Sequence, residues 1–230
     1  MLKPNAMAIA IAAALLPGAA SAHHGLDFLT VQTAHLPMQG TAYAIARADY
    51  ISEHEDELEF APAMLYGATD WMAFELHAHF EKEQGDSAHY ESLAPALHFR
   101  LTPRDNKFSL GISAEYEIAS DNDAEDVLEL AGILGYEASG WTIAANLLFE
   151  KASGEESEWG FAAGARRSLK PNHYLGLELI GSLQSNGPSE LLLGYYGDLS
   201  TRFSINAALG TGLDDGPDWS ARTAFIWRFR

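Results

Sequence analysis

Imidazole and carboxylate groups recur at every second position within residues 71–81. They are, in order, Glu75, His77, His79 and Glu81. Because side chains two residues apart on a strand point to the same face, we expect these four groups to share one face. Imidazoles bind copper and zinc, so a divalent metal is one predicted occupant, with His98 on the next stretch as a further ligand. The other interpretation is that the histidines hydrogen-bond to neighbouring carboxylates.

A second candidate metal site lies at the expected start of the mature chain. Residues 1–22 have the features of a secretory signal peptide: a charged start, an apolar run and the small residues Ala20-Ser21-Ala22 before the cleavage point. Cleavage there leaves His23 and His24 beside a free amine, a ligand set for copper, nickel or zinc. Alternatively, these histidines simply follow the cleavage point. No other cofactor is expected.

Alternation of apolar and polar residues continues along most of the chain. A period of two predicts β-strands. Twelve stretches show it: residues 41–50, 58–67, 71–81, 92–101, 108–118, 127–136, 141–149, 159–167, 174–183, 190–197, 202–209 and 219–229. We therefore divide the sequence into a signal peptide (1–22), a lead or plug segment (23–40) and a β-barrel (41–230).

The connections between these stretches alternate in length and chemistry. Short turns such as 68–70 and 138–140 alternate with longer, mostly acidic loops such as 82–91 and 120–126. This arrangement is typical of an outer-membrane barrel. The sequence thus predicts an all-β fold, a transmembrane antiparallel up-and-down barrel of about 12 strands, with both termini periplasmic because the strand number is even. A soluble periplasmic β-sandwich or jelly roll is the alternative.

The faces opposite the apolar ones carry many ionisable side chains, too many for a dry core unless they are paired. The residues expected to line the lumen are Arg47, Glu75, His77, His79, His98, Arg100, Glu115, Glu117, Glu129, Arg166, Glu178, Arg202 and Arg222. Two interpretations stay open. Such a lumen either conducts small solutes or is filled by a network of salt bridges.

The overall charge is strongly acidic. The sequence has 32 Asp and Glu against 14 Lys and Arg, a formal net charge of -18, which argues against a nucleic-acid partner. The chain has no cysteine, so disulfides do not stabilise it. The acidic loops either bind divalent cations that also bridge lipopolysaccharide phosphates or form a solvated, repulsive surface.

The last stretch carries a resemblance to a known class of protein. Trp219, Phe225, Trp227 and Phe229 form an alternating aromatic strand near the C-terminus. This strand resembles the signal read by the barrel-assembly machinery in Gram-negative outer-membrane β-barrel proteins, although Arg230 follows the final aromatic residue. The size and exported lead resemble small channels of the fatty-acid and aromatic-hydrocarbon transport type, including transporters linked to phenol degradation. The resemblance implies outer-membrane lipid, lipopolysaccharide and the assembly machinery as partners.

One short motif is similar to a catalytic stretch. Outer-membrane phospholipase A, also a twelve-stranded barrel, has His-x-Ser-Asn-Gly where this chain has Leu183-Gln184-Ser185-Asn186-Gly187. Leu183 replaces the histidine, and a serine needs an adjacent base to become a nucleophile. We therefore expect a tight turn and no enzyme activity. The expected function is passive passage of an unknown small solute; the alternatives are a non-conducting structural or metal-binding barrel and, third, a lipid-acting hydrolase.

Overall fold

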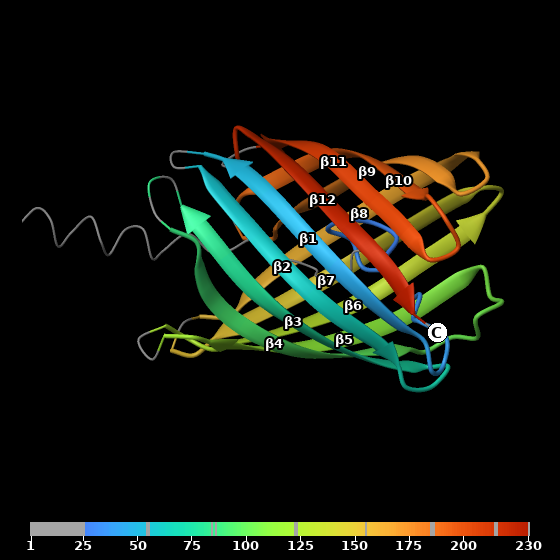
Figure 1. Ribbon diagram of the computed structural model, residues 1–230, viewed down its shortest axis with the longest axis horizontal. Coiled ribbons are helices and arrows are strands. Elements are labelled where there is room, and N and C mark those ends of the chain that lie inside the picture. The colour runs from blue at the N-terminus through green and yellow to red at the C-terminus, as the bar shows by residue number, and fades with distance from the viewer. Residues whose placement is uncertain are drawn as a thin grey trace, which may run out of the picture.

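The computed structural model describes residues 26–53, 56–83, 85, 87–121, 124–154, 156–184, 187–213 and 216–229. Twelve antiparallel strands form one closed barrel, in which each strand pairs with its sequence neighbours and β1 pairs with β12 (Figure 1). The strands are β1 (Ala42–Ser52), β2 (Glu57–Gly67), β3 (Met72–Glu83), β4 (His89–Arg100), β5 (Phe108–Ala119), β6 (Val127–Ala138), β7 (Trp141–Ala152), β8 (Glu158–Lys170), β9 (His173–Ser182), β10 (Ser189–Asp198), β11 (Phe203–Leu213) and β12 (Trp219–Phe229). The predicted all-β, antiparallel up-and-down barrel of about twelve strands is confirmed.

The first and last strands close the barrel along their whole length. Ala42 lies opposite Phe229 at one end of the seam, and Ser52 lies opposite Trp219 at the other. Closure leaves no row of unpaired backbone groups, which an apolar surrounding would not tolerate. The alternative of a two-sheet sandwich is therefore wrong. Within the described ranges, no helix is long and apolar enough to cross a membrane.

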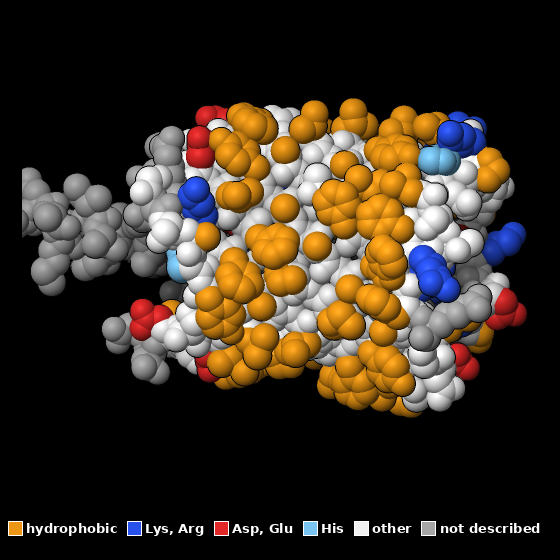
Figure 2. Space-filling model, viewed as in Figure 1, with side chains coloured by type: hydrophobic (Ala, Val, Ile, Leu, Met, Phe, Trp, Pro, Cys, Tyr) orange, Lys and Arg blue, Asp and Glu red, His pale blue; other side chains and the backbone are white. Residues whose placement is uncertain are grey.

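The two faces of the wall have opposite chemistry. In β5, Phe108, Leu110 and Ile112 are exposed, whereas Ser109 and Ser113 face inward and are buried. The same alternation exposes large hydrophobic side chains on each of the strands β2 to β12. On the face shown in Figure 2, hydrophobic side chains spread over the middle of the barrel and the charged groups lie toward its two ends. An apolar exterior around a polar interior is the arrangement of a barrel made for lipid surroundings.

The connections differ between the two ends of the barrel. Ser139 and Gly140 join β6 to β7 with φ angles of 52° and 80°, a left-handed pair that suits a two-residue hairpin. At the other end, seven residues, 120–126, separate β5 from β6, although a connection of the same length, 101–107, joins β4 to β5 at the first end. After the β6–β7 turn and the β5–β6 loop, we call these the short-turn end and the long-loop end. β1 starts and β12 finishes at the short-turn end, where the C-terminus lies (Figure 1).

The segment before β1 lies inside the barrel. Of residues 26–40, which we call the plug segment, 26–37 form a buried or half-buried irregular loop within the ring of strands, and 38–40 are exposed where the chain joins β1 (Figure 1). Phe28, Leu29 and Val31 are at most 1% exposed and belong to the main hydrophobic cluster together with inward-facing residues of the wall. The largest apolar core of this protein is thus made between the plug segment and the lumen wall.

Small residues of the wall make room for the plug segment. Ala131, Ala144 and Ala162 face it from β6, β7 and β8. A Cβ atom added at Gly164 would lie 3.0 Å from the Phe28 ring and 3.1 Å from a Val31 methyl. Larger side chains at such positions would fill the lumen and exclude the segment, so the wall is shaped to this occupant.

Candidate functional site

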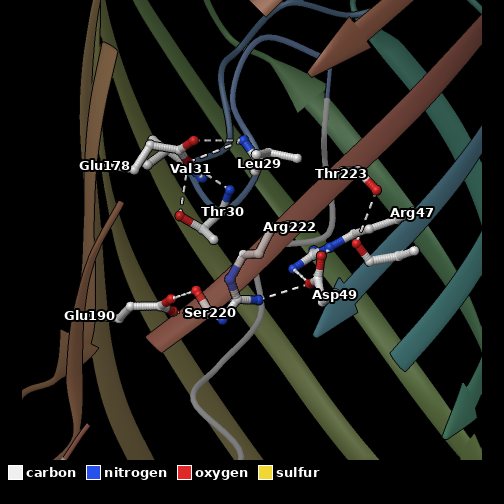
Figure 3. Close-up of polar contacts among 11 residues, drawn as sticks. Leu29, Thr30, Val31, Arg47, Asp49, Glu178, Glu190, Ser220, Arg222 and Thr223 are labelled. Carbon is white, nitrogen blue, oxygen red and sulfur yellow. Dashed lines mark hydrogen bonds and ion pairs between the residues drawn. The ribbon is translucent and has the colours of Figure 1, made fainter. Parts of the chain in front are cut away.

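The strongest polar anchor of the plug segment is Glu178, on the inner face of β9. Its carboxylate is fully buried and accepts hydrogen bonds from the backbone N–H groups of Leu29 (2.9 Å), Thr30 (2.7 Å) and Val31 (3.1 Å) (Figure 3). The hydroxyls of Thr30 and Tyr196 donate to it as well, at 2.8 Å and 2.6 Å. Three successive amides that surround one anion form a nest, and here the nest holds a carboxylate of the wall.

Two further wall residues hold the middle of the plug segment. Asn146 of β7 accepts from the Gln32 N–H at 2.7 Å and donates to the Gln32 carbonyl at 2.9 Å. Ser113 of β5 donates to the Gln32 side-chain oxygen at 2.7 Å. The amide side chain of Asn146 therefore pairs with the backbone of Gln32 as a neighbouring strand would. It satisfies a buried N–H and a buried carbonyl that have no strand partner.

Arginines bind the part of the plug segment that leads back to the wall. Arg100, at the end of β4, donates to the Ala34 carbonyl at 3.0 Å. Arg104, in the turn after β4, donates to the carbonyls of Leu36 and Pro37 at 2.9 Å and 3.0 Å. Guanidinium groups thus satisfy the carbonyls of this irregular chain near the short-turn end.

The start of the plug segment is fixed by an ion-pair cluster. Arg166 of β8 donates to the backbone carbonyl and the carboxylate of Asp27, and the Asp27 Oδ2 accepts from Thr33 and lies 2.6 Å from the His35 Nδ1. Nε2 of His35 lies 3.2 Å from Glu137. Burial acts to raise the pKa of Asp27, but the charge of Arg166 and the contacts with His35 overcome it and bring the pKa well below its usual value.

The same contacts act on His35 in the opposite direction. The negative charge of Asp27 raises the pKa of His35 above its ordinary value, against the opposing effect of burial, and Glu137 adds to the rise. The protonated imidazole is therefore favoured when the plug segment is in place.

A cavity of about 270 Å³ adjoins this cluster at the short-turn end. Its lining includes Asp27 and His35 of the plug segment, Arg166 and Arg228, and three tyrosines, Tyr43, Tyr174 and Tyr196. The guanidinium of Arg166 lies 4.6 Å from the centroid of the Tyr174 ring, and that of Arg228 lies 5.1 Å from the Tyr43 ring. The lining also includes Asp198, so the cavity offers charged groups of both signs together with aromatic faces.

A separate ion-pair network crosses the closing seam toward the long-loop end (Figure 3). Arg222 of β12 donates to Asp49 of β1 at 2.8 Å and to Glu190 of β10 at 2.6 Å, and Arg47 donates to Asp49 at 2.8 Å. Ser220 donates to Glu190. Each arginine thus has an acidic partner, so this part of the lumen holds paired charge and does not carry a free cationic track.

The predicted histidine cluster also faces the lumen. His98 lies 2.9 Å from Glu75, His77 lies 3.2 Å from Glu115, and the rings of His77 and His79 are 4.7 Å apart. Among the described residues, no group of three or more His, Cys, Asp or Glu side chains is arranged to hold a metal ion. His23 and His24, the other predicted ligands, lie outside the described residues, as do Ser185 and Asn186 of the predicted turn.

The remaining predicted lumen residues lie in two different places. Glu115 and Glu129 stand directly opposite each other on β5 and β6, and Ser92 of β4 donates to Glu117 on the inner face of β5. Arg202, however, is exposed in the turn before β11, one residue outside that strand.

Several important residues were not among the predicted set. Asp27, His35 and the amides of residues 29–31 lie in a segment without strand periodicity. Asn146, in contrast, is a polar residue at an inward-facing position of a strand that alternates regularly. The sequence could thus have placed Asn146 in the lumen, whereas nothing in it links Asp27 to Arg166, 139 residues away.

Comparison with known proteins shows similarity in the fold. The sequence matches no protein-family model and no curated protein. An outer-membrane channel from Pseudomonas putida F1 has a TM-score of 0.71 at 11% identity, over 86% of this chain and 98% of that chain. The KdgM porin gives 0.61 at 9% identity, over 82% and 99%, and the NanC porin gives 0.59 at 8%, over 80% and 98%. The chain therefore has the fold of outer-membrane β-barrel channels.

Proposed function

We propose that this protein is an outer-membrane channel for small solutes, and that residues 26–40 hold it closed in the state described. The observation that carries the proposal is an apolar-walled barrel with a polar lumen, filled by a segment that is not part of its wall. Similar solved structures are described as an outer-membrane channel and as porins, which supports the same function.

The way the plug segment is held supports a removable closure. Its first twelve described residues, 26–37, contact the wall through side chains such as Glu178, Asn146 and Arg100. Because these contacts are not part of the strand ladder, their loss would release the segment without opening the wall of the barrel. Movement of the segment would uncover the small wall residues that it packs against, together with Glu178 and Asn146.

The expected surroundings follow from the two ends of the barrel. The exposed apolar band would face acyl chains, the short-turn end would face the periplasm with both termini, and the long acidic loops would face outward toward lipopolysaccharide. Insertion would use the barrel-assembly machinery, and the signal peptide would be removed beforehand. Solutes would then diffuse passively through the lumen when the plug segment moves.

Swelling of proteoliposomes tests this function. Liposomes that contain the purified mature protein should swell in isotonic solutions of small sugars or amino acids faster than empty liposomes. A folded barrel, verified by its heat-dependent shift in gel mobility, that leaves the swelling rate unchanged for every solute would contradict the channel function.

A further inference from the structure

The cavity at the short-turn end has the chemistry of a binding site. It is smaller than the pockets of drug-sized ligands, about 300–1,000 Å³, so it suits a small molecule. The tyrosine rings supply flat surfaces against which a ring or a short carbon chain can pack. Two arginines on different strands, Arg166 of β8 and Arg228 of β12, supply the cationic groups.

Arg228 is available to an anionic ligand. Its guanidinium lies over the Tyr43 ring and reaches the Thr201 carbonyl at 3.5 Å, a long hydrogen bond. No carboxylate of the described residues lies within ion-pair distance of it. A guanidinium is a planar donor that matches a carboxylate, so an acid that enters the cavity would find a partner here.

Arg166 already shows how the cavity binds a carboxylate. It holds the Asp27 side chain and the Asp27 carbonyl, and its guanidinium is packed against Tyr174 and lies within 5.4 Å of the Phe28 ring centroid. Asp27 itself lines the cavity. The side chain of the plug segment therefore occupies the position that a free carboxylate would take on Arg166.

We propose that this cavity binds a small monocarboxylate, and that the bound carboxylate competes with Asp27 for Arg166 and thereby loosens the start of the plug segment. Binding itself does not depend on the proposed function, and only the consequence for opening rests on it. The competition also sets the expected affinity. Because Asp27 belongs to the same chain, it acts at an effective concentration of about a millimolar or more, so the dissociation constant should be in the millimolar range.

Benzoate is a suitable probe because it combines a carboxylate with a ring that fits the tyrosine faces. Binding to the full mature protein in detergent can be followed by titration calorimetry, with benzamide as the neutral molecule of the same shape. Benzoate should bind at least tenfold more tightly than benzamide. Equal affinities, or no binding of benzoate up to 50 mM, would overturn the carboxylate assignment.

Substitution of Arg228 tests the site itself. Arg228→Gln should weaken benzoate binding about tenfold because the unpartnered guanidinium is lost. Arg202→Gln is the matched control, since Arg202 is an exposed arginine at the same end that does not line the cavity. Equal losses in both variants would mean general attraction to the positive surface and would overturn the site.

Substitution of Asp27 tests the competition. Asp27→Asn should bind benzoate about tenfold more tightly than the native chain, because Arg166 loses its internal carboxylate. Asp70→Asn, an exposed aspartate in the turn after β2, should leave affinity unchanged. An Asp27→Asn affinity equal to or weaker than the native value would overturn the competition.

A second variant keeps the test decisive if Asp27→Asn alters folding. Arg166→Gln removes the charged group for which benzoate and Asp27 compete, so it should weaken benzoate binding while the barrel keeps its heat-dependent gel mobility. Unchanged affinity in that variant would also overturn the competition. Since these measurements report binding without conductance, their failure is distinct from failure of the channel function.

Discussion

Replacement of Glu178 by glutamine should open the channel. The substitution keeps the size of the side chain and one acceptor oxygen, but it removes the charge and turns an NH₂ group toward donors of the plug segment. In the native chain one oxygen, Oε2, accepts from Leu29 N, Thr30 N, Thr30 Oγ1 and Val31 N. In the variant, an NH₂ group replaces one of the two carboxylate oxygens, so one of these two positions can no longer accept a hydrogen bond.

The magnitude follows from these contacts. A hydrogen bond to a charged group contributes ~1.5–3 kcal/mol, and a buried donor left without an acceptor costs ~1–3 kcal/mol. The contacts share one carboxylate and are not additive, so about 3 kcal/mol is a reasonable loss for the closed state. At 1.4 kcal/mol per factor of ten, the equilibrium between closed and open states should shift by about a hundredfold.

Two measurements check this prediction. Single-channel recording should show a higher open fraction for Glu178→Gln, and amide hydrogen exchange should become faster at Leu29, Thr30 and Val31. Glu156→Gln, at an exposed loop position between β7 and β8, is the control and should behave as the native chain. If Glu178→Gln leaves both the open fraction and the exchange of these amides within threefold of native values, the nest does not hold the plug segment.

Three further predictions concern the same closed state. Gly164→Val should displace Phe28 and raise the open fraction in single-channel recordings at least tenfold, because the added atoms begin 3.0 Å from the Phe28 ring. Gly132→Val is the control and should leave the open fraction unchanged, because a Cβ there would meet open space. The pKa of His35 is raised in the closed state, so protonated His35 stabilises that state fully below its ordinary pKa of 6.5, and this stabilisation is lost as pH rises through the higher value. The open fraction should therefore increase in alkaline solution. His35→Gln should abolish that increase. Arg222→Met should lower the unfolding temperature of the barrel in detergent, because Asp49 and Glu190 lose the arginine that they share. Removing one partner of a buried ion pair destabilises a fold by ~3–5 kcal/mol. An unchanged unfolding midpoint would contradict the network.

The wall of this barrel could be predicted from the sequence, whereas for residues 23–40 the sequence left a lead and a plug as alternatives. Alternation in residues such as Met72, Phe74 and Leu76 reports directly on the two faces of a strand, because each position faces either the lumen or the outside. Strand ends are less well defined, as Arg202 shows, since the pattern does not mark where pairing stops. Local periodicity thus predicted the strands, and the alternating connections predicted that they form a barrel.

The contacts of the plug segment depend on long-range packing. Residues 26–31 mix apolar and polar side chains without a regular period, which is compatible with a lead or a plug. Only the closed barrel brings the amides of Leu29 and Thr30 to Glu178, almost 150 residues away in sequence. The role of Glu178 as an anchor therefore could not be distinguished from that of any other inward glutamate.

Conductance across a planar bilayer tests the central claim most directly. The native mature chain should show long closed periods with brief openings, whereas a chain that lacks residues 26–38 should conduct steadily, with both proteins verified as folded barrels. Two results would contradict the account: a folded deletion variant that passes no current, or native and deletion chains with the same open fraction and unitary conductance.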